Sequence, residues 1–219
     1  MVKRKSIEFR ESRNPISGHI TKFGGQPAWL AGPQWPLNRT TGNPMRFIGQ
    51  VVIDPELFGP ASPQMAYLFM TDEEEDVDGT WEANGGENAL VLQPGHVNCP
   101  NKPLAEGPSL YRMAKKLLHK KLVPEPCEFA VTLDPGSDPD LADDAQRMKW
   151  DDSQNKSYVA ALEGNKIGGT PMFIQNPEFP RTGALASAFA AGLRKGPFFS
   201  EFRRYGHWLC LFVCGWARG

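Results

Sequence analysis

One fifteen-residue motif occurs twice in this chain, and it constrains the fold more than any other feature. The first copy spans residues 22–36 (KFGGQPAWLAGPQWP) and the second spans residues 166–180 (KIGGTPMFIQNPEFP). Six positions are identical, namely the lysine, both glycines and three prolines. A glycine pair permits backbone conformations that a Cβ would forbid, and proline fixes its own φ. The repeat therefore predicts a duplicated backbone device in a domain built from two related halves.

Aromatic residues stand close to the prolines in both copies: Trp29 and Trp35 in the first, Phe173 and Phe179 in the second. In an extended, proline-bounded segment a flat ring can cover a core, which predicts a kinked lid over one end of a β-layer. The alternative is an aromatic groove that binds an extended segment of another protein. Trp29 and Trp35 are therefore candidate partner-binding residues.

Composition favours one soluble, cytoplasmic domain. Of the 219 residues 40% are hydrophobic, which is enough for a core, and the net charge of −1 gives no general attraction to nucleic acid or membranes. No apolar run is long enough to cross a membrane, and the basic start lacks the apolar stretch of a signal peptide. We expect a single domain over residues 1–219, with an N-terminal half of about 1–133, a connector over 134–152 and a C-terminal half over about 153–219.

Hydrophobic patterning predicts an α+β fold that is predominantly β, with two pseudo-symmetric β-rich halves and a few peripheral helices. An amphipathic helix is expected at 109–123, capped by Ser109 and ended by Pro124, with a basic face that is most simply solvated. An alanine-rich segment predicts a second helix at 182–193. The predicted strands are 5–10, 47–53, 65–70, 89–93, 128–133 and 207–213.

The string KxGGxPxW at residues 22–29, followed by PMRFIGQV at residues 44–51, resembles the YwqG-like family of bacterial domains of unknown function. A domain of the eukaryotic programmed cell death protein two is related to that family. The likeness covers residues 18–70 and 155–215 and implies a duplicated, β-rich domain without catalytic activity. The eukaryotic relatives imply chaperone-like protein binding, and the bacterial relatives lie among toxin–immunity systems. Family members continue into a further aromatic strand, so an open C-terminal edge that forms a homodimer is a further expectation.

An acidic run at residues 72–78 (DEEEDVD) precedes Gly79. Its spacing superficially fits a calcium loop, but Gly85 stands where the bidentate glutamate is required. The run is either a solvated hairpin tip or an interface loop that meets a basic surface, such as the active-site cleft of a nuclease toxin. The candidate partner-binding residues of this run are Asp72, Glu73, Glu74, Glu75, Asp76 and Asp78.

Catalytic, metal and cofactor chemistry find little support in the sequence. There is no nucleophile elbow, phosphate-binding loop or dinucleotide fingerprint. Cys210 and Cys214 lie four positions apart in a predicted strand, too far from each other to share a metal, and Cys99 and Cys127 complete the cysteines. We therefore expect no enzyme, no metal and no cofactor. The predicted function is a cytoplasmic immunity protein that neutralises a toxin of a contact-dependent or type VI-like system; a chaperone-like module for extended clients and an enzyme with an unrecognised site are the alternatives.

Overall fold

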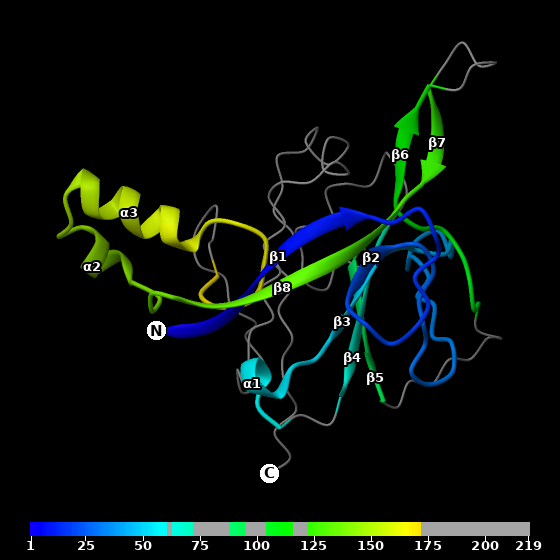
Figure 1. Cartoon of the computed structure of the whole chain (residues 1–219), viewed down its shortest axis with the longest axis horizontal. Helices are drawn as coiled ribbons and strands as arrows, with labels where there is room; N and C mark the ends of the chain where they lie inside the picture. The colour runs from blue at the N-terminus through cyan, green and yellow to red at the C-terminus, as the bar shows by residue number, and fades with distance from the viewer. Residues whose placement is uncertain (61–62, 72–87, 95–103, 116–121, 172–219) are drawn as a thin grey trace. The chain divides into compact units, whose positions relative to one another are not determined.

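A computed structural model of the chain describes residues 1–60, 63–71, 88–94, 104–115 and 122–171 (Figure 1). The described part is mostly β with a few short helices, which confirms the predicted fold class. The elements are β1 (Val2–Glu11), β2 (Lys22–Gly24), β3 (Arg46–Val52), α1 (Pro55–Phe58), β4 (Met65–Met70), β5 (Asn88–Gln93), β6 (Tyr111–Ala114), β7 (Val123–Pro126), β8 (Glu128–Asp138), α2 (Asp144–Arg147), α3 (Asp152–Leu162) and β9 (Lys166–Gly168).

The chain divides into two compact units. The described residues of unit 1 fall within 1–8, 54–60 and 132–171, and those of unit 2 within 9–53, 63–71, 88–94, 104–115 and 122–131. Strands β1 and β8 each contribute residues to both units. The two copies of the sequence motif are thereby separated, because the first begins in unit 2 and the second in unit 1.

Unit 2 is built on antiparallel strands in the order β5-β4-β3-β2-β8, where β8 enters with its first residues. The expected strands at 47–53, 65–70 and 89–93 are confirmed, because apolar runs of this length suit strands buried in a sheet. The register sets Gln50 opposite Tyr67 and Met65 opposite Gln93. A bulge in β3 lies between Phe47 and Gly49. The same face of neighbouring strands therefore carries both polar and aromatic side chains.

The helix predicted at 109–123 is wrong. Tyr111–Ala114 forms β6, which pairs antiparallel with Val123–Pro126 as β7, and residues 116–121 lie outside the described residues. Ser109 caps no helix here and instead forms a parallel bridge with Phe47. The prediction was wrong because it rested on the helical spacing of the apolar residues. Leu110, one of these residues, is buried in unit 2 without lying on a helix. Tertiary contacts decide between helix and strand for a short apolar segment of this kind.

Unit 1 contains the rest of β8, the start of β1 and β9, in the order β8-β1-β9. Residues 134–152, the expected connector, contain the end of β8, which continues to Asp138, and then α2 and the first residue of α3. Both helices begin with a capping box, in which Asp143 and Asp151 accept from the N–H groups of Gln146 and Gln154 at 2.7 and 2.8 Å. The helix predicted at 182–193 and the strand predicted at 207–213 lie outside the described residues. No helix of the described chain is long and apolar enough to span a bilayer.

Candidate functional site

The segment after the first glycine pair lies across the β3-β4-β5 sheet face, and we call residues 26–36 the strap. Two side chains of neighbouring strands hold its start. Gln50 Oε1 accepts the Ala28 N–H at 2.8 Å, and the Gln50 amide also donates to the Ile20 carbonyl at 2.8 Å. The Tyr67 hydroxyl accepts the Leu30 N–H at 2.6 Å and donates to the Ala28 carbonyl at 2.8 Å. The strap backbone is thus held by side chains instead of by a strand ladder.

Further along, the strap is held by Gln93, the last residue of β5. Gln93 Oε1 accepts the Ala31 N–H, and Gln93 Nε2 donates to the Gly32 carbonyl, both at 2.8 Å. Gln93 is fully buried, as are Gln50 and Tyr67, so the side-chain end of each of these bonds is shielded from water. Each contributes roughly 0.5–1.5 kcal/mol net, and losing one partner would leave a buried polar group unpaired. The strap is therefore fixed along its length.

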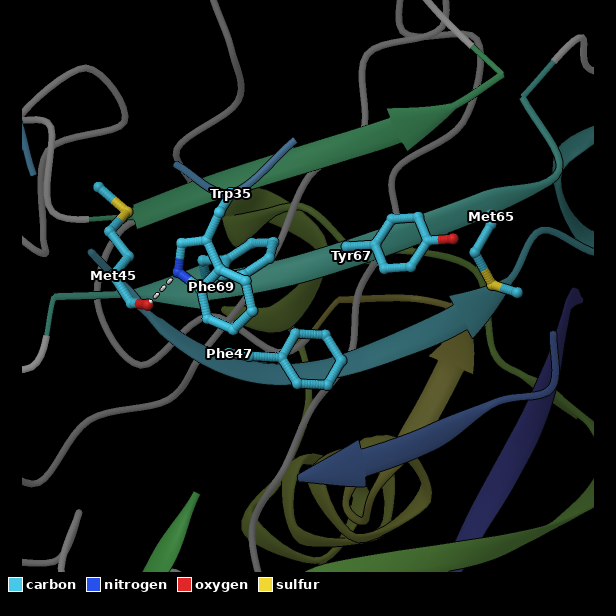
Figure 2. Packing of buried hydrophobic residues seen from close by; sticks show 6 residues of the cluster. All are labelled: Trp35, Met45, Phe47, Met65, Tyr67 and Phe69. Carbon is cyan, nitrogen blue, oxygen red and sulfur yellow. Dashed lines mark hydrogen bonds between the residues drawn. The ribbon is translucent and has the colours of Figure 1, made fainter. Parts of the chain in front are cut away.

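Aromatic packing also holds the strap against the sheet. Trp35 is 5% exposed, lies in the core with Met45, Phe47 and Phe69, and donates its indole N–H to the Met45 carbonyl at 2.7 Å (Figure 2). Its ring meets Phe69 edge-on at a centroid distance of 5.2 Å. This packing agrees with the interpretation of the motif as a lid over a β-layer.

Trp29 differs from Trp35 because it is only half-buried. Its ring stacks on Phe69 at 6.2 Å and 15°, and lies 4.8 Å from Tyr67. Its indole N–H donates to the Ala105 carbonyl at 3.0 Å, and its own carbonyl lies 3.1 Å from His19 Nε2. The ring is thus held in one orientation while part of its surface stays open to solvent. Of the two candidate binding residues that the structure describes, Trp29 is the accessible one.

In unit 2 the motif lysine is buried in an ion pair. Lys22 Nζ lies 2.6 Å from Glu128 Oε1 at the start of β8, and both side chains are largely buried, with exposures of 2% and 11%. Lys22 also donates to the Ile16 carbonyl at 2.6 Å, and Glu128 Oε2 accepts the Ile16 N–H at 3.0 Å. Gly25 follows with φ +63°, and a Cβ there would overlap the Glu128 carboxylate. The absence of a side chain at the second glycine of the motif therefore leaves room for the Glu128 carboxylate.

In unit 1 the second copy repeats this arrangement with different partners. The Lys166 ammonium pairs with Asp138, the last residue of β8, and donates to the Thr170 carbonyl at 2.8 Å. Asp138 is completely buried, and it also accepts the Thr170 N–H at 3.0 Å and pairs with Arg4 Nε at 2.6 Å. Gly169 has φ +79°, and a Cβ there would overlap Asp138. Both copies therefore combine a buried lysine, a carboxylate from β8 and a glycine that makes room for it.

Residues 21–212 match the family model described as Domain of unknown function (DUF1963). The chain belongs to this family. The DUF1963 match begins just before the first motif lysine and includes the second copy of the motif. Neither a search of curated proteins nor a search of solved structures found a match.

Cys127 is the one cysteine among the described residues of this DUF1963 domain, and it is buried. Burial raises the pKa of the Cys127 thiol to about 11, and the nearby Glu11 carboxylate adds to the effect, so the thiol is protonated at neutral pH. Protonated, buried thiols are poor nucleophiles and poor metal ligands. Among the described residues, no group of three or more His, Cys, Asp or Glu side chains could hold a metal ion.

The sequence-predicted site residues fall into three classes. Trp29 is half-buried on the strap surface and Trp35 lies in the core. The acidic residues Asp72–Asp78 lie outside the described residues, so their candidate role stays a prediction. Sequence reasoning missed Gln50 and Gln93, although a glutamine within or at the end of an apolar strand is an available signal of a buried polar contact.

Proposed function

We propose that this DUF1963 domain binds another protein and catalyses no reaction. The observation that carries the proposal is the half-buried Trp29 ring, held in one orientation by Phe69, by Tyr67 and by the Ala105 carbonyl. Tryptophan dominates binding energy at many protein interfaces because it buries a large area with few rotatable bonds. A ring that is already ordered loses little conformational entropy on binding. Trp29 would therefore act as the anchor of the interface.

The surroundings of Trp29 suit a protein partner. Leu104, next to Ala105, is 42% exposed, and the strap residues Ala31 and Gly32 are exposed as well. Apolar side chains around an aromatic anchor exclude water from an interface, whereas His19 and Glu106 can form its polar rim. The buried charges of the two motif copies support a non-catalytic role, since Lys22 and Lys166 are 2% and 3% exposed and both are ion-paired.

The specific form of the proposal is an immunity protein that neutralises a toxin of a contact-dependent or type VI-like system in the cytoplasm. It rests first on the resemblance of the sequence to YwqG-like bacterial domains. It rests also on the acidic residues Asp72–Asp78, which would form a second contact with a basic toxin surface. Carboxylates facing such a surface would speed association and make it salt-dependent.

The test pairs this chain with the secreted toxins of its host, one at a time, in co-expression and in calorimetry. We expect that this chain restores the growth of cells that express one of the toxins. The same toxin should form a stoichiometric complex with the chain in calorimetry. Trp29→Ala should weaken that complex by about 2 kcal/mol or more, roughly thirtyfold, as buried interface tryptophans do. Trp150→Ala is the matched control, because Trp150 is also half-buried and packs on Tyr158 at 5.1 Å in unit 1.

Because Trp29 also packs on core rings, a second variant separates binding from folding. Leu104→Glu changes an exposed side chain and should weaken the complex while leaving the unfolding midpoint within error of wild type. The proposal would be contradicted if the chain protected cells from none of the toxins. It would also be contradicted if the Trp29→Ala and Leu104→Glu variants both bound the toxin with wild-type affinity.

A chaperone-like function is the second candidate, and exposed apolar side chains in unit 2 favour it. Ile20, Leu37 and Leu104 are 50%, 42% and 42% exposed, which suits weak contacts with varied extended clients. The sequence resemblance that leads to programmed cell death protein two also supports this alternative. Binding of many unrelated unfolded proteins, all weakened by Leu104→Glu, would favour the chaperone over the immunity protein. One dedicated toxin partner would decide the other way.

A further inference from the structure

Two segments of unit 2 are fixed to the strap, and the first is the loop that contains His19. The Gln50 amide donates to the carbonyls of Gly18 and Ile20 at 3.1 and 2.8 Å. The same side chain accepts the Ala28 N–H of the strap at 2.8 Å. One buried glutamine therefore holds the loop and the strap together, and His19, between the two bonded carbonyls, is exposed.

The second segment contains Glu106, and two side chains of the strap bind it. Gln26 donates to the Gly107 carbonyl at 2.9 Å and accepts the Gly107 N–H at 3.0 Å. The Trp29 indole donates to the Ala105 carbonyl at 3.0 Å. Glu106 lies between these two bonded residues and is exposed. The backbone on both sides of this carboxylate is therefore fixed next to the strap.

The bond between His19 and the strap decides which ring nitrogen carries the hydrogen. His19 Nε2 lies 3.1 Å from the carbonyl oxygen of Trp29, and a carbonyl can only accept. Nε2 must therefore be the donor, and in the neutral ring Nδ1 is then an acceptor. The described residues offer this exposed ring no other hydrogen-bond partner. Neutral His19 thus presents an acceptor to a partner.

We propose that the Trp29 surface binds a basic segment of the partner protein. An apolar side chain of that segment covers the Trp29 ring, and lysine or arginine side chains flank it. The two polar groups of the rim, His19 Nδ1 and the Glu106 carboxylate, are both acceptors. Lysine and arginine side chains only donate, so they satisfy both groups, whereas an acidic segment satisfies neither. The inference rests on the proposed function, because it gives the chemistry of the partner at that site.

Protonation of His19 opposes such a partner. A proton on Nδ1 turns the acceptor into a donor and gives the ring a positive charge, which repels lysine and arginine. The strap carries no titratable side chain. On the elements around it, Lys22 and Glu128 are paired, burial raises the pKa of Tyr67, Glu106 is the rim carboxylate, and none of these four bonds to His19. Affinity should therefore fall as the pH drops from about 8 to about 5, where histidine gains its charge.

Binding of the full chain to immobilised peptides tests the charge preference. Each peptide carries one leucine or phenylalanine, flanked by lysines in one series, by glutamines in another and by glutamates in a third. The lysine series should retain the chain most strongly at about pH 7.5, and its affinity should fall by roughly tenfold at about pH 5.5. Equal binding to all series, or stronger binding to the glutamate series, would overturn the proposal.

Variants of exposed residues assign the preference to the rim. His19→Gln keeps a donor for the Trp29 carbonyl and an acceptor that does not titrate, so its binding should lose the pH dependence. His19→Lys and Glu106→Lys should each weaken binding to the lysine series by about tenfold, with unchanged unfolding midpoints. Ser157→Lys, at an exposed position of α3 in unit 1, is the matched control and should bind like wild type. A His19→Gln variant with the pH dependence of wild type would overturn the role of His19.

Nitrogen chemical shifts of His19 in the isotope-labelled free chain test the tautomer without any partner. Nε2 should carry the hydrogen at neutral pH, and a neutral ring with the hydrogen on Nδ1 would overturn the proposal. The inference can also fail while the proposed function stands. That result would be a toxin that this chain neutralises and that the His19→Lys and Glu106→Lys variants bind with wild-type affinity.

Discussion

Gly25→Ala is the sharpest test of how the repeated motif works. Gly25 has φ +63°, a region that favours glycine, and a Cβ there would overlap the Glu128 carboxylate. That carboxylate is the flexible end of a side chain, so the overlap can be relieved by moving it. Moving it, however, separates Glu128 from Lys22, whose side chain is 2% exposed. The substitution should therefore act through the ion pair as well as through the backbone.

The magnitude follows from these two effects. An alanine in the left-handed region costs about 1–2 kcal/mol. Breaking a buried ion pair, so that one charge is left uncompensated, costs about 3–5 kcal/mol. Gly25→Ala should then lower the free energy of unfolding by about 4–7 kcal/mol if the pair is lost entirely. Gly42→Ala is the matched control, since Gly42 has φ +72° and nothing within 4 Å of a Cβ, and should cost only the backbone strain.

Urea unfolding in two backgrounds separates the contributions. In the double variant Lys22→Met, Glu128→Ala the carboxylate and its partner are both gone, so Gly25→Ala should cost no more than Gly42→Ala does. The cost of Gly25→Ala should thus depend strongly on the background, as for residues in direct contact. An equal cost in both backgrounds would refute the idea that the glycine makes room for the carboxylate.

Two further predictions concern buried ionisable groups. Lys166→Met should destabilise the chain less than Lys22→Met in urea unfolding, because Asp138 retains its ion pair with Arg4 at 2.6 Å; an equal or larger loss would contradict this sharing. The Cys127 thiol, with a pKa of about 11 against an ordinary 9.0, favours folding only while it is protonated, so its contribution is complete below pH 9 and is lost as pH rises towards 11. The stability of wild type relative to Cys127→Ala should therefore fall between pH 9 and pH 11, and peptide-resolved alkylation at pH 8 should find Cys127 slow to react. A constant difference or rapid alkylation would contradict the buried, protonated thiol.

The sequence predicted unit 2 strands well and helices poorly. The strand predicted at 65–70 has the same ends as β4, because a short apolar run bounded by turn residues is typical of a buried strand. The segment at 109–123 has apolar residues at helical spacing, but pairing of Met113 with Pro124 and burial of Leu110 decided for strands. Helix α3 was missed although Asp151 and Gln154 form a capping box, a signal that can be read from the sequence.

The candidate site could be predicted only in part. The glycine pairs were expected to adopt unusual backbone conformations, and Gly24, Gly25, Gly168 and Gly169 do have positive φ. The role of the lysine could not be predicted, because its partners lie 106 and 28 positions away in the two copies. Lysine is usually exposed unless it is paired, and the sequence does not show that the fold brings a carboxylate next to this one.

The strap is held mainly by groups that carry no charge, and this has a consequence for the conditions under which the domain can work. Gln50 and Gln93 do not titrate, and burial raises the pKa of Tyr67 further above neutrality. Salt screens interactions between charges but has little effect on neutral hydrogen bonds inside a protein. The orientation of Trp29 should accordingly be the same in acidic and neutral media and in dilute and concentrated salt. Any partner that binds this surface would meet the same strap conformation, and the environmental sensitivity of the complex would come from charged groups outside the strap, on this chain or on the partner.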